Sequence, residues 1–130
     1  MALYALGDLA PQVDATAYVH PTAQLIGDVV VHAEASVWPG AVLRADFNRI
    51  EVGEGSAVED NTVVHPRGPR PTTIGRDCVI GHMAHLEGVT VEDAVLIGSG
   101  SIVLEGARIR TGAQTYRGLA RRYRDALRPI

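Results

Sequence analysis

The stretch from Val13 to Leu43, VDATAYVHPTAQLIGDVVVHAEASVWPGAVL, decides the fold, because an aliphatic residue returns in it at every sixth position. Beyond Leu43 the rhythm resumes three times, after intervals of nine, ten and five residues. The aliphatic positions are Val13, Val19, Leu25, Val31, Val37, Leu43, Val52, Val58, Val64, Ile74, Ile80, Leu86, Val91, Ile97, Val103 and Ile109. A period of six matches neither a helix nor an alternating strand, and it is typical of a hexapeptide β-helix.

Each hexad of such a fold makes one short strand and one tight corner, and three hexads close a triangular coil of roughly eighteen residues. The aliphatic side chains point inward and stack from coil to coil at roughly 4.8 Å. Four residues later the side chain is mostly small, as at Ala23 and Ala41, because this second inward position lies near a crowded corner. We therefore expect one domain, an all-β solenoid formed by a left-handed parallel β-helix over 13–112, with an N-terminal cap over 1–12.

The composition fits a narrow prism and argues against several classes of partner. Aromatic residues make up only 5% of the chain, as expected where stacked aliphatic side chains leave no space for large rings. A net charge of −3 gives no support for nucleic-acid binding, and the single Cys78 excludes a disulfide framework. The first nine residues do not resemble a signal peptide and no segment is apolar enough to span a membrane, so we expect a cytoplasmic protein without nucleic-acid or membrane partners.

Interruptions of the rhythm mark the candidate functional positions. The first interruption, after Leu43, contains Arg44 and Asp46, which are two residues apart and share one face if they lie on a strand. They form either an ordinary surface ion pair or a pair at a subunit contact or active site. The second, after Val64, contains HPRGPRP at 65–71, whose prolines favour a surface loop. Loops on rigid scaffolds often carry binding and catalytic residues.

Counting coils places a histidine and a glutamate at one corner. His65 and Glu87 each follow an aliphatic position and are 22 residues apart, of which four belong to the inserted loop. The remaining eighteen make one coil, so the two side chains should stack about 4.8 Å apart and are able to share a metal. His82 occupies a different face and would reach such a site only from a neighbouring subunit of a threefold ring. Because His20 and His32 also follow aliphatic positions, ordinary corner histidines are the alternative.

The region from Val37 to Val103 resembles the γ-class carbonic anhydrases of the hexapeptide-repeat superfamily. Four stretches carry the resemblance: VLRAD at 42–46, VEDNTVVH at 58–65, IGHMA at 80–84 and LIGSGS at 96–101. The resemblance implies a homotrimer that binds Zn²⁺ (or Fe²⁺) through histidines at subunit interfaces. It assigns the first ligand to His65 and the neighbour's ligand to His82.

The same resemblance implies further site residues and two departures from the family. Arg44 and Asp46 match its interface pair, while Glu59 and Asp60 match its Gln–Asp pair, so that these four are the candidate catalytic residues. Glu87 stands where the family has its third histidine. A Glu is an acceptable zinc ligand. However, Glu87 in place of His and Glu59 in place of Gln both add negative charge, so a water molecule bound to the zinc should be less acidic than in a site with three imidazoles.

Two further expectations concern the neighbourhood of the site and the C-terminus. We expect His85 to face the other side of its strand and so to be a poor substitute for the missing histidine. From Gln114 the pattern becomes helical, with apolar residues on one face at Tyr116, Leu119, Ala120, Tyr123 and Leu127. We expect a helix over 113–130 laid against the prism flank, with its arginines in solvent. Because a β-helix that ends at Ile109 has an uncapped edge, we also expect residues to be missing between Arg110 and Ala113.

Three function classes follow. The first is reversible CO2 hydration, with CO2 or bicarbonate as the ligand. The second is a trimeric metal-binding or scaffold protein for another small anion. The third is a hexapeptide-repeat acyltransferase, which requires a catalytic histidine on a long loop, and neither His20 nor His32 lies in one.

Overall fold

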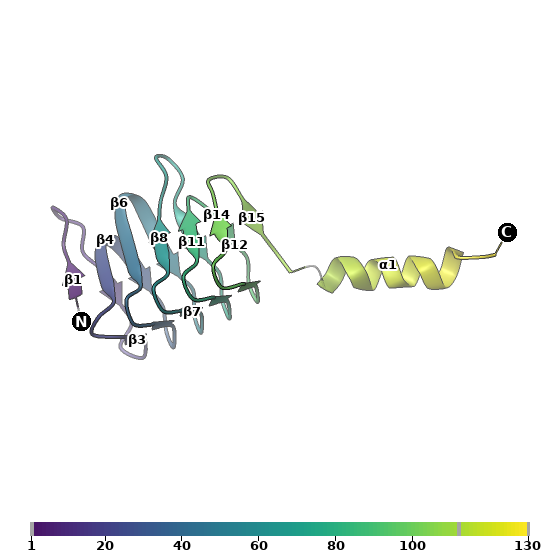
Figure 1. Cartoon of the computed structure of the whole chain (residues 1–130), viewed down its shortest axis with the longest axis horizontal. Helices are drawn as coiled ribbons and strands as arrows, with labels where there is room; N and C mark the ends of the chain where they lie inside the picture. Colours follow the sequence, from purple (N-terminus) through teal and green to yellow (C-terminus); the bar gives the residue numbers. More distant parts are fainter. Residues whose placement is uncertain (1, 112, 130) are drawn as a thin grey trace.

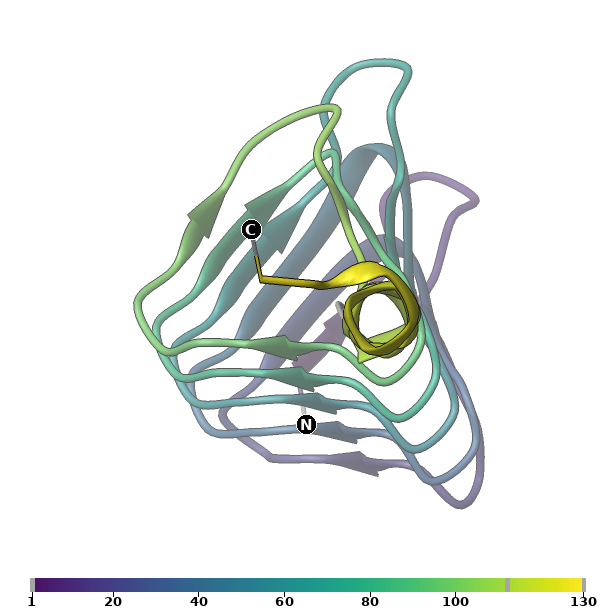
Figure 2. The ribbon, with the colours of Figure 1, turned by 90° about the vertical axis from the view of Figure 1, so that its right-hand side faces the viewer.

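The computed structural model describes residues 2–111 and 113–129 and forms a triangular prism followed by one helix (Figure 1). The prism is a left-handed parallel β-helix of about five turns, which confirms the predicted all-β solenoid. Seen along its axis, each turn contributes one edge to each of three faces (Figure 2). The expected rhythm of short strands and corners is therefore the actual architecture of the chain.

The three faces are parallel ladders of strands from successive coils. Face A consists of β1 (Ala2–Tyr4), the first halves of β4 (Gln24–Val31) and β6 (Val42–Val52), β8 (Val63–His65), β11 (His85–Glu87) and β14 (Ile102–Val103). Face B consists of β2 (Gln12–Val13), the second halves of β4 and β6, β9 (Thr72–Ile74), β12 (Thr90–Val91) and β15 (Arg108–Ile109). Face C consists of β3 (Tyr18–Val19), β5 (Ser36–Val37), β7 (Ala57–Val58), β10 (Val79–Ile80) and β13 (Leu96–Ile97).

The core is the column of periodic aliphatic residues inside the prism. Those from Val19 to Ile97 are buried, and those at the two ends are partly buried. The second inward position is small but not always apolar. Ser56 donates a hydrogen bond to the carbonyl oxygen of Gly75 in the next coil (2.6 Å), and its hydroxyl also accepts one from the amide of Cys78 (2.9 Å).

The two long interruptions are accommodated differently. In the first, β6 turns the corner between faces A and B as one strand, with Ala45 and Ile50 buried. Its pairing with β4 is interrupted there, since Ala45 pairs with Gly27 and Ile50 with Val29, so that residues 46–49 bulge out of the ladder. In the second, residues 65–71 form a loop closed by reciprocal backbone hydrogen bonds between Arg67 and Arg70 (2.9 and 3.0 Å). Both interruptions lie at this corner, which we call corner A–B.

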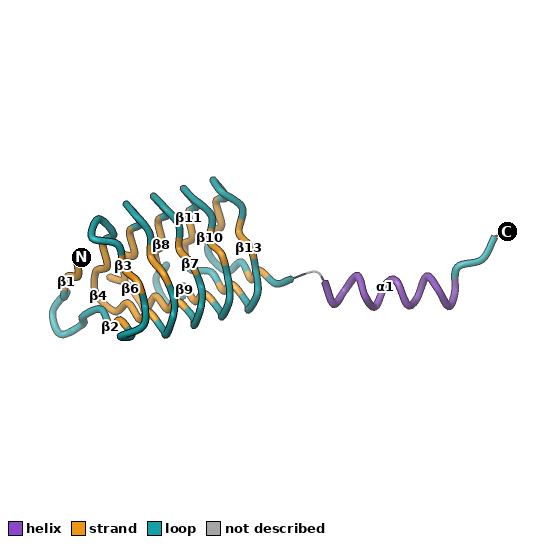
Figure 3. Tube along the Cα trace, turned by 90° about the horizontal axis from the view of Figure 1, so that it is seen from below, coloured by secondary structure: helices purple, strands orange, loops and turns teal. Residues whose placement is uncertain are grey.

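The C-terminal helix α1 (Ala113–Ala126) is present but does not lie where we expected it. It extends beyond the last coil (Figures 1 and 3), and its described side chains, including Tyr116, Leu119 and Tyr123, are exposed. The expectation that it packs on the prism flank is therefore wrong for the single chain, because an amphipathic pattern defines an apolar stripe without defining the surface that covers it. In the described part of the chain, no helix combines the length and apolar character needed to cross a bilayer.

The last coil is open, as the sequence led us to expect. Within the described residues, strands β13, β14 and β15 pair only with the coil before them, and the outward side chains Leu96 and Ile102 are both 73% exposed. The expected gap between Arg110 and Ala113 includes Gly112, which lies outside the described residues.

Candidate functional site

Corner A–B brings His65 and Glu87 together. Strand register pairs Glu87 of β11 with His65 of β8, which agrees with the coil count made from the sequence. The His65 Nδ1 and Glu87 Oε1 atoms are 3.9 Å apart. His65 is only 8% exposed, an unusual burial for an imidazole on a solenoid corner. The two side chains thus form a small polar centre beside the inserted loop.

The position of His65 is fixed from several sides. Its carbonyl oxygen accepts hydrogen bonds from the Thr72 hydroxyl (2.7 Å) and the Gly88 amide (3.0 Å), which tie the loop to the coil above. Its Nε2 atom donates to Asp46 Oδ1 at 2.8 Å. The ring of Phe47 stands edge-on to the imidazole, with the ring centroids 5.5 Å apart. As a result His65 Nε2 is engaged by Asp46, while Nδ1 points toward Glu87.

Arg44 and Asp46 form the expected pair. The Arg44 Nη1 atom is 2.7 Å from Asp46 Oδ2, so the two side chains do share one face of β6. Burial raises the pKa of Asp46, but the hydrogen bond from His65 and the positive charge of Arg44 outweigh it and lower that pKa overall. Asp46 therefore joins Arg44 and His65 as an ionised carboxylate.

Glu87 has two partners of its own. Its Oε1 atom accepts a hydrogen bond from Arg67 Nη1 (2.9 Å), and His85 Nε2 lies 3.2 Å from its Oε2 atom. The hydrogen bond with His85 and the Arg67 guanidinium lower the pKa of Glu87, against the opposing effect of burial. Our expectation for His85 was wrong: His85 and Glu87 are two residues apart on one strand, so they share its outward face.

The remaining candidate residues lie at a different corner, between faces C and A. His82 Nδ1 is 3.1 Å from Asp60 Oδ2, and His82 Nε2 is 2.8 Å from Glu59 Oε2. Both ring nitrogens therefore face carboxylates, and the His82 side chain is half exposed. In one chain the candidate residues thus form two separate half-sites, as the different position of His82 within its hexad predicted.

The donors at corner A–B fit part of a metal site. With ligand bonds of about 2.0–2.2 Å, a tetrahedral zinc ion holds two ligand atoms roughly 3.3 Å apart. The 3.9 Å between His65 Nδ1 and Glu87 Oε1 requires only a small adjustment. However, the described residues of one chain contain no group of three His, Cys, Asp or Glu side chains that one ion would join. A complete site therefore needs a donor from another molecule.

Sequence reasoning missed two residues at this corner. Arg67 neutralises Glu87, and Phe47 forms an apolar wall beside His65. Neither had a signal in the hexad pattern, since both belong to interruptions of that pattern. Arg67 lies within the inserted loop, 20 residues before Glu87, so the count of one coil per eighteen residues does not place it against Glu87.

Comparison with proteins of known name identifies the relatives of the chain. No family model matches it. It is 45% identical over 105 residues to gamma carbonic anhydrase 1, mitochondrial, of Arabidopsis thaliana, which covers 76% of this chain and 38% of that protein. It is 39% identical over 109 residues to the carnitine operon protein CaiE of Escherichia coli, covering 84% of this chain and 56% of CaiE. The chain thus spans about half or less of the length of these relatives.

A solved structure extends the comparison to nearly the whole chain. The crystal structure of a hexapeptide transferase family protein from Anaplasma phagocytophilum matches with a TM-score of 0.68 and 32% identity, over 94% of this chain and 98% of that one. The chain therefore belongs to the hexapeptide-repeat, left-handed β-helix superfamily, as a γ-class carbonic anhydrase-like protein.

Proposed function

We propose that this protein is a homotrimeric metalloprotein that catalyses the reversible hydration of CO2. The metal, Zn²⁺ or Fe²⁺, would be held by His65 and Glu87 of one subunit and by His82 of its neighbour. The observation that carries the proposal is the strand register that joins His65 to Glu87 at one corner while His82 lies at another. Relatives named gamma carbonic anhydrase support the reaction.

The distribution of outward side chains supports side-by-side packing of prisms. Faces A and C expose apolar residues in their later coils, among them Ile102 on face A and Leu96 on face C. Face B instead presents polar residues in register, namely Glu51, Thr73, Thr90 and Arg108. A ring that joins face A of one subunit to face C of the next buries both apolar faces and leaves face B in solvent.

Each protein group has a role in this proposal. When bound, the metal ion would act as a Lewis acid that makes water nucleophilic near neutral pH. Asp46, aligned by Arg44, holds the His65 ring so that Nδ1 faces the site. Glu59 and Asp60 orient His82, and their carboxylates are available to accept the proton released when CO2 and water form bicarbonate.

Metal content and assembly test the proposal directly. We expect the purified protein to have a trimer mass by light scattering and to contain one divalent ion per subunit by elemental analysis. His65→Ala and His82→Ala should each abolish metal binding, whereas His20→Ala, which removes a histidine from an earlier coil, should not. A monomer at micromolar concentration, or full metal content in His65→Ala, would contradict the shared site.

The negative charge of Glu87 and Glu59 should limit the rate. A carboxylate ligand reduces the Lewis acidity of the ion relative to imidazole, so we expect slow CO2 hydration at pH 7 that increases at higher pH. The double change Glu87→His and Glu59→Gln should raise the rate, measured by stopped-flow hydration with metal content as the control. A parent protein that is already fast at pH 7 would refute this reasoning. A metal-loaded trimeric double variant that gains nothing would favour a non-catalytic binding or scaffold role.

Acyl transfer is the second candidate, because the chain resembles a hexapeptide transferase family protein. The observation that favours it is His32, whose Nε2 atom lies 2.6 Å from Glu51 Oε1 beside a cavity of about 360 Å³. A histidine paired with a carboxylate has the composition of a general base. Binding of acetyl-CoA, measured by calorimetry and lost in His32→Ala, would support this candidate.

A further inference from the structure

A second pocket lies on the other side of the 65–71 loop, between this loop and the last coil. Its volume is about 410 Å³. It is lined by Pro69, Arg70, Pro71, Gly88, Thr90, Gly106, Ala107 and Arg108. Among these described residues the ionisable side chains are two arginines, and none is a carboxylate. The pocket therefore favours a negatively charged occupant.

Arg70 differs from most other arginines of the prism. Of the six arginines between residues 44 and 108, five contact a carboxylate: Arg44, Arg49, Arg67, Arg76 and Arg108. Within residues 2–111 and 113–129, the Arg70 side chain forms neither an ion pair nor a hydrogen bond. Its guanidinium group, with five N–H donors in a planar fork, is thus available to a ligand.

The position of the Arg70 guanidinium is nevertheless defined. The backbone of Arg70 is held by its two hydrogen bonds with Arg67. Its guanidinium lies across Gly106, with Cζ and Nη1 each 3.6 Å from the place where a Cβ atom on that glycine would stand. Arg70 thereby reaches from the loop toward the last coil, where its guanidinium lies beside Gly106 without a charged partner.

Two further donors face the same space. Thr90 and Arg108 are register partners on face B and both line the pocket. Glu92 accepts a hydrogen bond from the Nε atom of Arg108, which fixes this side chain. The backbone amide of Thr90 donates a hydrogen bond to the carbonyl oxygen of Ala107. The hydroxyl group of Thr90 takes no part in this backbone hydrogen bonding. The pocket therefore combines a free guanidinium, an anchored one and a hydroxyl.

We propose that this pocket is a binding site for a small oxyanion, a carboxylate, bicarbonate or phosphate, held in bidentate contact by Arg70. A planar fork of N–H donors matches an O–C–O or O–P–O edge, which a spherical anion such as chloride lacks. The site is separate from the half-site of His65 and Glu87, since the loop directs Arg67 to Glu87 and Arg70 to this pocket. It does not depend on the proposed carbonic anhydrase activity.

Calorimetric titration of the full chain with phosphate, bicarbonate and acetate, each at constant ionic strength set by chloride, tests the proposal. We expect at least one oxyanion to bind, and Arg70→Gln to weaken its binding by about tenfold or more. Arg70→Lys should bind more weakly than the parent but more tightly than Arg70→Gln, because it keeps the positive charge without the bidentate fork. The matched control is Arg76→Gln, which removes the same charge from an exposed arginine at another corner and should bind like the parent.

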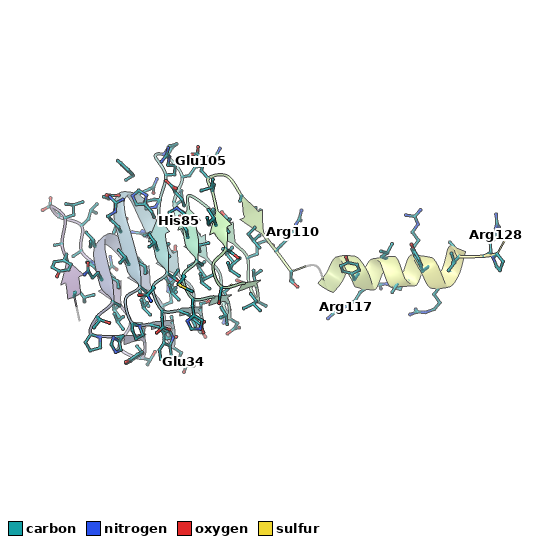
Figure 4. The ribbon with its side chains drawn as sticks, in the orientation of Figure 1. Glu34, His85, Glu105, Arg110, Arg117 and Arg128 are labelled. Atoms are coloured by element: carbon teal, nitrogen blue, oxygen red, sulfur yellow. The ribbon has the colours of Figure 1, made fainter. Side chains whose placement is uncertain are left out.

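Two other variants distinguish a built pocket from general attraction to positive charge. Glu105→Gln removes the carboxylate next to Gly106, at the edge of the prism that bears the loop (Figure 4), and should strengthen anion binding. Thr90→Val should weaken it by a few fold while leaving the fold intact by circular dichroism. Binding of phosphate alone, or of the carboxylates alone, would identify the chemical class. The proposal is overturned if no oxyanion binds, or if Arg70→Gln and Arg76→Gln weaken binding equally.

Discussion

At the scale of single residues, the candidate site is a set of charges placed by strand register. Asp46, His65 and Glu87 come from three consecutive coils and meet at one corner: strand register joins His65 to Glu87, and a side-chain hydrogen bond joins Asp46 to His65. Each has a partner that limits its rotation: Arg44 for Asp46, Asp46 for His65, and Arg67 for Glu87. The side chains are therefore prepositioned before any ligand binds.

Asp46 should make the stability of the protein depend on pH. Its pKa is lowered in the folded state, so its stabilising effect is fully present above the unfolded pKa of about 3.9 and is lost as pH falls through the folded value. We expect Asp46→Asn to lower the free energy of unfolding at pH 7 by about 1–2 kcal/mol, and by much less near pH 3. Urea denaturation at both pH values measures this, with the exposed Asp8→Asn as the control. An equal loss at both pH values would show that the ionised carboxylate is not responsible.

At the scale of elements, the 65–71 loop depends on one glycine beneath it. Gly88 has a φ of +62°, and a Cβ atom there would lie 2.8 Å from the Cβ atom of Arg67. The loop therefore packs directly on the backbone of the next coil. This packing places Arg67 against Glu87 and Arg70 over the last coil.

Replacing Gly88 should displace the loop. We expect Gly88→Ala to combine backbone strain, of about 1–3 kcal/mol, with a steric clash, and so to destabilise the protein and weaken metal retention at His65. Gly100→Ala is the matched control, since Gly100 also has a positive φ (+74°) but has open space around its Cβ position. Thermal unfolding compares the two variants. If both lose the same stability, only strain matters and the loop is not held by this contact.

The sequence predicted elements well where the hexad rhythm is regular and less well at its interruptions. The periodic aliphatic residues define the core, and one-coil counting correctly brought His65 to Glu87. One-coil counting did not reveal that the nine-residue interval is a bulge within one continuous strand, because the bulge depends on how β6 pairs with β4 rather than on the period. In the hexad pattern Ser56 occupies a position defined only by small size, although the Ser56 hydroxyl group links two coils. Such contacts join residues a whole coil apart and have no local pattern.

At the scale of the whole molecule, prism and helix are oppositely charged. Helix α1 and the residues after it carry five arginines and one aspartate, so the remainder of the chain holds most of the acidic residues. The described helix side chains are exposed, and Arg117 and Arg128 lie beyond the last coil of the prism (Figure 4). The described side chains of the helix thus contribute no buried contact to the core of their own chain.

Removing residues 113–130 should therefore leave the prism intact. We expect the truncated protein to keep the parent circular dichroism signal of its strands and the parent Tm, because the side chains of residues 116–129 are exposed. Light scattering on the same sample tests whether the trimer also survives. A large drop in Tm would show that the helix covers part of the prism in solution.

The pairing of each coil with only its immediate neighbours has a consequence for how the molecule opens. A solenoid of this kind is nearly one-dimensional, so its stability is close to a sum of coil terms and nearest-neighbour terms. Among the described residues, the first coil (β1, β2 and β3) and the last coil (β13, β14 and β15) each have a neighbour on one side only, so opening is expected to start at these two ends and to advance inward as fraying. The central coils, which carry His65 and Asp46, are the last to exchange their amide protons, so the candidate site lies in the part of the protein that stays closed longest.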